Sequence, residues 1–147
     1  MKRKKIIAVS GGFDPIHAGH VRMFREAAEF GNVIVILNSD EWLIRKKGYR
    51  FMSLEERSYI CENIKGVIAT FDVDDSDGTV CKALEQIRPD AFANGGDRYE
   101  SNTPEMDICK ELGIEMLWNV GGEKSQSSRD LVASVVWGKR RINGQII

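Results

Sequence analysis

Two short, wholly apolar segments with a helical pattern between them constrain this chain most strongly. Ile6–Val9 and Val33–Leu37 contain no polar residue, and between them Val21, Phe24 and Ala28 recur at helical spacing. Strands that are apolar on both sides are typical of parallel sheets whose two faces are covered by helices. The segment therefore predicts a βαβ unit, with its helix over His20–Phe30.

The same alternation of strands and helices continues to the end of the chain. Further strands are predicted at Val67–Phe71, Ala91–Ala93 and Ile114–Trp118, and further helices after Ser53, Val80 and Thr103-Pro104 and around Leu131. Ser53 followed by Glu56 forms a capping-box pattern, and Gly113 is a helix stop. We expect an α/β fold with a single domain over residues 1–147, a Rossmann-like doubly wound sheet of about five parallel strands with helices on both faces.

Composition argues against several classes of function. Lys and Arg number 21 against 22 Asp and Glu, and the net charge of −1 disfavours a general nucleic-acid binder. The apolar runs are too short to span a bilayer. The three cysteines are odd in number and lack a Cys-x-x-Cys pair, which indicates packing in the core and a reducing, cytoplasmic location. Neither a P-loop nor a Gly-x-Gly-x-x-Gly fingerprint is present.

The unusual residues fall in the loops that follow the predicted strands, at residues 10–20, 38–52, 94–103 and 119–128. In doubly wound sheets the ligand binds beyond the carboxyl ends of the strands. His17 and His20 are the only histidines, and they flank Ala18-Gly19 where a helix should begin. A helix amino terminus favours phosphate, two imidazoles add donors, and Gly19 would let the backbone approach the ligand. The alternative is that one histidine caps the helix while the other packs.

The segment Gly11-Gly12-Phe13-Asp14-Pro15-Ile16-His17-Ala18-Gly19-His20 resembles the signature of the cytidylyltransferase-like nucleotidyltransferases. The resemblance continues at Asn38-Ser39-Asp40-Glu41, Lys46, Ser53 to Arg57, Gly95-Gly96-Asp97 and Ser127-Ser128. By pattern the chain is similar to glycerol-3-phosphate cytidylyltransferases and heptose-1-phosphate adenylyltransferases. The resemblance implies transfer of a nucleotidyl group from CTP or ATP, with Mg²⁺, to a phosphorylated small alcohol or sugar, with release of pyrophosphate. The choice between CTP and ATP stays open, as does the formation of a homodimer. The alternative function is a non-catalytic module that binds or senses a nucleotide.

The resemblance also implies roles for individual residues. It makes His17, His20 and Lys46 catalytic, with Lys46 in a mobile loop over residues 45–52. It assigns the nucleotide to Gly11, Gly12, Phe13, both histidines, Gly95, Gly96, Asp97, Ser127 and Ser128, and the acceptor to Asp14, Lys46 and Arg57. For each of these assignments an alternative stays open. Lys46 could be a solvated lysine with Lys47 in its functional place, and Arg57 could form an ion pair with a neighbouring carboxylate. Gly95-Gly96 could be a plain turn, and the serines could only cap a helix.

Overall fold

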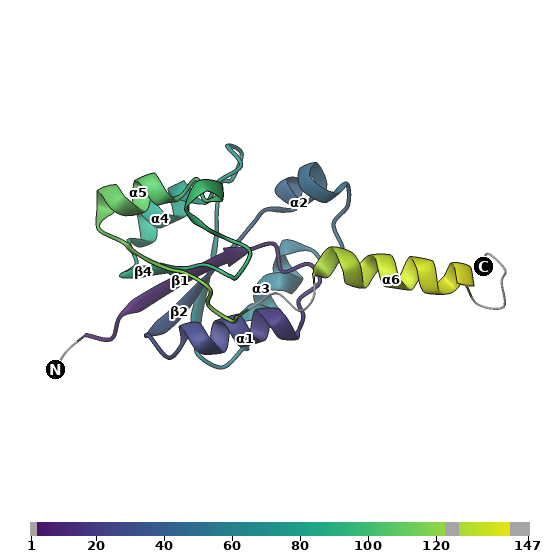
Figure 1. Ribbon diagram of the computed structural model, residues 1–147, viewed down its shortest axis with the longest axis horizontal. Coiled ribbons are helices and arrows are strands. Elements are labelled where there is room, and N and C mark those ends of the chain that lie inside the picture. The colour runs from purple at the N-terminus through teal and green to yellow at the C-terminus, as the bar shows by residue number, and fades with distance from the viewer. Residues whose placement is uncertain (1–2, 123–126, 142–147) are drawn as a thin grey trace.

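The computed structural model describes residues 3–122 and 127–141, which form one five-stranded parallel sheet with helices around it (Figure 1). The strands are β1 (Ile6–Gly11), β2 (Asn32–Leu37), β3 (Val67–Asp72), β4 (Ala91–Ala93) and β5 (Glu115–Leu117). The helices are α1 (Ala18–Ala27), α2 (Asp40–Lys47), α3 (Leu54–Glu62), α4 (Cys81–Ile87), α5 (Met106–Leu112) and α6 (Ser128–Arg141), with a short 3₁₀ turn at Glu100–Asn102. The strand order β3-β2-β1-β4-β5 confirms the doubly wound sheet.

The central strand β1 explains why both faces of the sheet are covered. Alternate residues of a strand point to opposite faces. Ile7 and Val9 pack in one buried cluster with Phe24 of α1 and Cys61 of α3. Ala8 packs in the other cluster, which contains residues of α4 and α5. In Figure 1 α1 accordingly lies on one side of the sheet and α4 and α5 on the other.

The order of the strands places the site. Strand β1 pairs with β2 on one side and with β4 on the other. The first three strands therefore extend the sheet in one direction from β1, and β4 and β5 extend it in the other. In such sheets this switch point is where loops diverge and leave a crevice at the carboxyl ends. The loops after β1 and β4 both begin there.

Some predicted boundaries are wrong by a few residues. Helix α1 begins at Ala18 rather than His20, because His17 takes the capping position. Helix α5 begins at Met106, not at Thr103-Pro104, since the Thr103 hydroxyl donates to the Tyr99 carbonyl and closes the 3₁₀ turn instead. Strand β5 is shorter than predicted.

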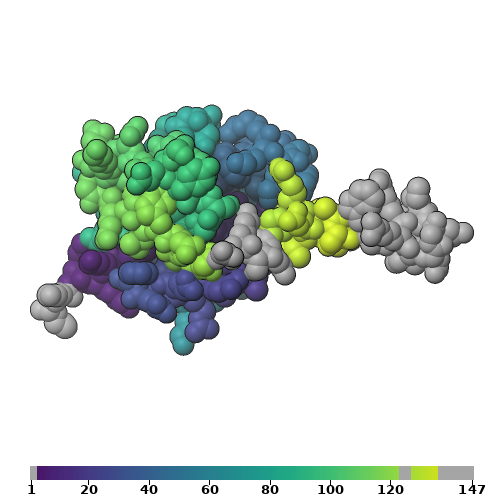
Figure 2. Space-filling view, viewed as in Figure 1, coloured from purple at the N-terminus to yellow at the C-terminus, as the bar shows by residue number. Residues whose placement is uncertain are grey.

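Helix α6 leaves the body of the molecule beside α2 (Figures 1 and 2). Its first residue contacts the loop after β1: the Ser128 hydroxyl donates a hydrogen bond to the Pro15 carbonyl at 2.7 Å. In the described ranges no helix has the length and apolar character needed to cross a membrane.

Candidate functional site

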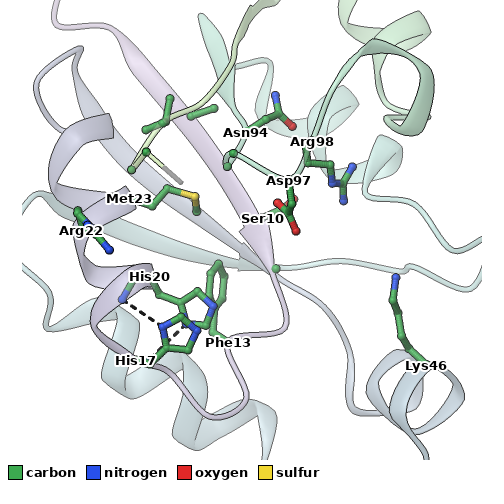
Figure 3. Close-up of a pocket in the computed structure, with 18 of the residues that line it drawn as sticks. Ser10, Phe13, His17, His20, Arg22, Met23, Lys46, Asn94, Asp97 and Arg98 are labelled. Carbon is green, nitrogen blue, oxygen red and sulfur yellow. Dashed lines mark hydrogen bonds between the residues drawn. The ribbon is translucent and has the colours of Figure 1, made fainter. Parts of the chain in front are cut away.

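A cleft opens where the carboxyl ends of β1 and β4 meet (Figure 3). Its first part, a cavity of about 330 Å³ that we call the strand lobe, is lined by the ends of these strands, the start of α1 and the loop at 120–122. A second cavity of about 360 Å³, the helix lobe, is lined by the end of α2 and by Ser127, Ser128 and Arg129. Both lobes share Phe13, His17, His20, Trp42 and Lys46.

The two histidines sit side by side at the amino terminus of α1. His17 is the capping residue, and its Nδ1 accepts the Gly19 N–H at 3.1 Å. His20 Nδ1 in turn accepts the His17 N–H at 3.3 Å. The two imidazole rings stack with centroids 3.8 Å apart, and the ring of Phe13 lies perpendicular to that of His20 with centroids 4.9 Å apart. The predicted cap and the predicted ligand role are therefore compatible, because capping uses Nδ1 alone.

These backbone contacts fix the tautomer of both rings. A neutral imidazole has one N–H donor and one acceptor, so a ring whose Nδ1 accepts carries its proton on Nε2. His17 and His20 each thus have Nε2–H as a donor, one helical turn apart. Two such donors beside a helix amino terminus suit an oxyanion.

Gly19 makes room for the cap of α1. A Cβ on Gly19 would lie 2.9 Å from Cε1 and 3.1 Å from Nδ1 of His17, because the imidazole ring folds back over the glycine. Gly19 also lines the strand lobe, and close approach of a ligand to its backbone stays a prediction.

Gly11, Gly12 and Phe13 link the strand to the histidines. Gly11 lines the strand lobe, Gly12 the helix lobe and Phe13 both. Phe13 has a positive φ of 51° and is buried, with its ring 5.1 Å from that of Phe24. The loop thus turns Phe13 into the core, where it supports His20.

Asp14 and Arg57 do not line either lobe, although the resemblance assigns them to the acceptor. Both side chains are buried. Asp14 accepts the backbone N–H groups of Phe51 and Met52. Arg57 donates to the carbonyls of Gly12, Asn38 and Met52. It also donates to Asp40 at 2.7 Å, so the ion pair left open as the alternative is the contact that Arg57 makes.

Arg57 also sets the charge state of its partner carboxylate. Burial raises the pKa of Asp40, but hydrogen bonds from Arg57 and Arg50 outweigh this effect, and the pKa is lowered overall. Asp40 is the first residue of α2 and follows its cap, Ser39. The network therefore joins the start of α2 to the loop after β1.

Three side chains from distant segments hold three carbonyls of the loop after β1. Arg57 donates to Gly12 O, Lys47 Nζ to Asp14 O at 3.1 Å, and Ser128 to Pro15 O. Because these carbonyls are held by donors outside the loop, the path that leads to His17 is fixed before any ligand arrives.

Lys46 lies on a helix and not in the predicted mobile loop. Helix α2 extends to Lys47 and ends at Gly48, whose φ is 84° and whose N–H donates to Ile44. Lys46 lines both lobes, and its Nζ lies 5.1 Å from the centre of the Trp42 ring. Charge explains the helix: Asp40 and Glu41 occupy its first turn, and its last turn is basic, as the helix dipole favours.

The loop after β4 contains the predicted Gly95, Gly96 and Asp97, all of which line the strand lobe. Arg98, which directly follows them and which the sequence places in the same loop, lines that lobe too. Among the lining side chains that escaped the sequence argument are Arg22, Met23 and Trp42. A signal existed for Trp42, which precedes Lys46 by one helical turn.

Ser127 and Ser128 line the helix lobe and also have structural partners. Ser127 Oγ accepts the Asp130 N–H at 3.0 Å and caps α6, which is the predicted alternative. Ser128 is tethered to Pro15. Arg129 lines the same lobe. Residues 124–126, which precede the serines in the predicted loop at 119–128, lie outside the described residues.

The cleft is basic in a chain whose net charge is −1. Among the described residues that line its two lobes, Asp97 is the acidic one; the basic ones are Arg22, Lys46, Lys47, Arg98 and Arg129. Such a concentration of positive charge in a concave site attracts polyanions.

Comparison with known proteins gives consistent relatives. The family model described as cytidylyltransferase-like matches residues 8–121. The bifunctional protein HldE of Sulfurimonas denitrificans is 36% identical over 76% of this chain, which corresponds to 24% of that protein. The FAD synthase of Ferroglobus placidus is 35% identical over 76% of this chain and 72% of its own length. The chain thus spans about a quarter of the length of HldE.

Solved structures support the fold. A lipopolysaccharide core biosynthesis protein from Thermoplasma volcanium superimposes with a TM-score of 0.65 at 21% identity, over 79% of this chain and 94% of that one. A structure described as a nicotinate-nucleotide adenylyltransferase from Vibrio parahaemolyticus gives 0.62 at 16% identity, over 92% of this chain and 89% of that one.

Proposed function

Since this chain belongs to the cytidylyltransferase-like family, we propose that it is a nucleotidyltransferase. It would transfer CMP or AMP from CTP or ATP to a phosphorylated small alcohol or sugar and release pyrophosphate. The names of its relatives support this class of reaction, because an FAD synthase and an adenylyltransferase are among them.

One observation carries the proposal: the stacked pair of His17 and His20, whose Nδ1 atoms both accept backbone N–H groups. The pair therefore holds two Nε2–H donors beside the amino terminus of α1, at the junction of the two lobes, and Nε2 of His17 is buried there. Donors that are fixed before the reaction stabilise charge that develops in the transition state. The junction is the place where an α-phosphate would sit if the nucleoside filled one lobe and the remaining phosphates the other.

The chemistry needs no nucleophile from the protein. An oxygen of the acceptor phosphate attacks the α-phosphorus, the bond from that phosphorus to the bridging oxygen of the β-phosphate breaks, and pyrophosphate leaves. Catalysis then consists of holding two anions in line and stabilising charge. His17 and His20 would donate to the α-phosphate, and Lys46 would neutralise charge on it from the other side of the cleft.

Mg²⁺ would enter with the nucleotide. Among the described residues no group of three or more His, Cys, Asp or Glu side chains could hold a metal ion. Among the described residues that line the cleft, Asp97 has the acidic side chain. A small cation that keeps its waters and binds phosphate oxygens fits such a site better than one that needs a protein cage.

The test is a matrix of four nucleoside triphosphates against a panel of phosphorylated alcohols and sugars, with Mg²⁺, read as pyrophosphate release. We expect release with CTP or ATP, and only when an acceptor is present. The panel includes glycerol 3-phosphate and a heptose 1-phosphate, the two acceptors named by the sequence pattern.

A matched pair of variants controls the assay. His20→Asn removes the Nε2–H donor from the cleft, whereas Arg25→Gln alters an exposed arginine on the same helix. Release at the wild-type rate in His20→Asn would contradict the assignment. Nucleotide binding without pyrophosphate from any combination would favour the non-catalytic module.

A further inference from the structure

Arg98 and Glu105 form an ion pair at the wall of the cleft, and neither residue has a role in the proposed reaction described above. Arg98 lines the strand lobe, and its side chain is 37% exposed. Glu105 lies behind it with a side chain that is 3% exposed, and Arg98 Nη1 is 3.5 Å from Glu105 Oε1. A half-exposed guanidinium on a buried carboxylate is a cation that is held in place but still has donors to offer.

The backbone on which Arg98 sits is also held. Asn102 Nδ2 donates to the Asp97 carbonyl at 3.0 Å, and its Oδ1 accepts the Tyr99 N–H at 2.8 Å. The Thr103 hydroxyl closes the same turn by donating to the Tyr99 carbonyl. Arg98 thus extends from an ordered turn, and less entropy is lost when it binds a ligand.

Glu105 is only partly satisfied by this contact. Within the described residues, its Oε2 is buried and has no hydrogen-bond partner. A buried carboxylate of this kind is stabilised by a cation nearby, and a guanidinium prefers to bind oxyanions in a fork. The pair can therefore hold Arg98 at the cleft wall while the remaining N–H groups of the guanidinium bind an oxyanion on the open side.

On these observations we propose that Arg98, positioned by Glu105, binds the phosphate of the acceptor. This inference rests on the proposed nucleotidyl transfer. Arg98 does not line the helix lobe, where Ser127, Arg129 and Lys47 are available to the phosphates of the nucleotide.

Figure 3 shows the spatial basis for this choice of ligand. Arg98 and Lys46 extend on one side of the cleft, whereas Arg22 and Met23 lie on the opposite side, with the histidines below. A dianion between Arg98 and Lys46 would therefore approach the junction from the side of the cleft opposite Arg22 and Met23. An acceptor phosphate held there would lie next to the junction to which the α-phosphate is assigned.

The test measures phosphate binding without requiring turnover. The intact chain is first saturated with Mg²⁺ and the α,β-methylene analogue of CTP or ATP, whichever gives the larger rise in Tm. Inorganic phosphate is then titrated at constant ionic strength, and the further rise in Tm gives its apparent Kd. We expect Arg98→Gln to weaken phosphate about tenfold or more, the scale of a lost charge-assisted hydrogen bond, and to leave the nucleotide shift unchanged.

Three variants separate positioning from folding. Glu105→Gln keeps the shape but not the charge, and it should weaken phosphate less than Arg98→Gln does. Arg98→Lys should restore part of the affinity. If Arg98→Gln alone fails to fold, the double variant Arg98→Gln, Glu105→Gln removes the uncompensated carboxylate and takes its place. Arg25→Gln is the control and should match the wild type.

Each outcome decides between the two claims. No shift with either nucleotide analogue in the wild type would overturn the proposed function itself. A nucleotide shift with no phosphate shift, or a phosphate shift that survives Arg98→Gln, would overturn the role of Arg98 alone. Loss of the nucleotide shift in Arg98→Gln would assign Arg98 to the nucleotide. Once an acceptor is known, Arg98→Gln should raise its KM and leave the KM for the nucleotide unchanged.

Discussion

His17 and His20 each divide their two ring nitrogens between folding and chemistry. Nδ1 of each ring accepts a backbone N–H at the start of α1, so each ring is oriented by the fold. The same contact assigns the proton to Nε2. Substitution of either residue by alanine would therefore remove a cap contact and a donor at once, and the two losses could not be told apart.

A pair of variants at His20 separates these losses. In His20→Asn the amide oxygen replaces the acceptor near Nδ1 but no donor reaches the position of Nε2. In His20→Gln the longer side chain places an N–H near Nε2. We expect kcat to fall by about 10²–10³ in His20→Asn, the scale for one preorganised donor, and by less in His20→Gln.

Pyrophosphate release and thermal unfolding provide the two readouts. Tm should stay near the wild-type value in His20→Asn, because the backbone N–H keeps an acceptor. Equal rates for the two variants would show that His20 acts through the conformation of α1 and not through its Nε2–H.

The sequence motif predicts which residues lie near the site, but it does not predict several of their roles. The spacing of His17 and His20 places both in the cleft, as predicted. Asp14 and Arg57 belong to the same motif pattern, yet they are buried and bind backbone groups. Sequence spacing indicates which residues lie near a site; burial, which depends on residues far away in the chain, decides whether a charge faces the ligand.

Among the elements, α2 is the clearest departure from the prediction. Its eight residues show little apolar periodicity, with Leu43 as the buried one, so the hydrophobic pattern did not reveal a helix. The helix signals were polar: the Ser39 cap, acids in the first turn, bases in the last and Gly48 at the end. Asp75 anchors the cap, since it accepts from both the N–H and the hydroxyl of Ser39.

Because α2 is anchored, Lys46 needs no loop closure to reach the cleft. Its Nζ rests near the ring of Trp42 and lines both lobes. A lysine that stabilises charge only in the transition state lowers kcat and kcat/KM together when it is removed. We expect this pattern for Lys46→Ala, with nucleotide affinity from calorimetry changed by less than about 1 kcal/mol.

Lys47→Ala gives a different expectation. Lys47 Nζ donates to the Asp14 carbonyl, so its loss loosens the loop that carries the histidines. We expect a smaller fall in kcat than for Lys46→Ala, together with a lower Tm. Lys110→Ala on α5, an exposed lysine outside both lobes, is the silent control. A larger fall in kcat for Lys47→Ala would make Lys47 the functional lysine.

At the scale of the molecule, the strands of the doubly wound sheet followed from local patterns, but their order and the contacts between loops did not. Each strand of the parallel sheet shows in a run of a few residues. By contrast, the contact from Ser128 to Pro15 spans 113 positions, and that from Gly121 to Glu26 spans 95. Such contacts depend on where two loops meet once the sheet has formed, and no local pattern encodes that meeting.

Carboxylates that accept hydrogen bonds or form ion pairs give the folded protein a predictable response to acid. The pKa values of Asp40, Asp74, Asp77 and Asp90 are all lowered. For Asp40, hydrogen bonds from Arg57 and Arg50 outweigh the opposing effect of burial; for Asp74, hydrogen bonds from Ser76 and Lys82 dominate. The unfolded chain therefore binds protons more tightly at these groups. Their stabilisation is complete above the ordinary aspartate pKa of about 3.9 and is lost as pH falls through the lower folded values.

Urea unfolding between pH 7 and pH 3 tests this expectation, with Asp40→Asn and Asp74→Asn as a matched pair. The free energy of unfolding should fall steeply below about pH 4 in the wild type. Asp40→Asn should cost about 1.5–3 kcal/mol at pH 7, because it removes a charged partner from the buried Arg57, and should make the acid slope shallower. Asp74 pairs with Lys82 in solvent, so Asp74→Asn should cost much less than Asp40→Asn. Equal losses in the two variants would mean that Arg57 is satisfied by its three carbonyl partners and that Asp40 adds no more than a surface charge.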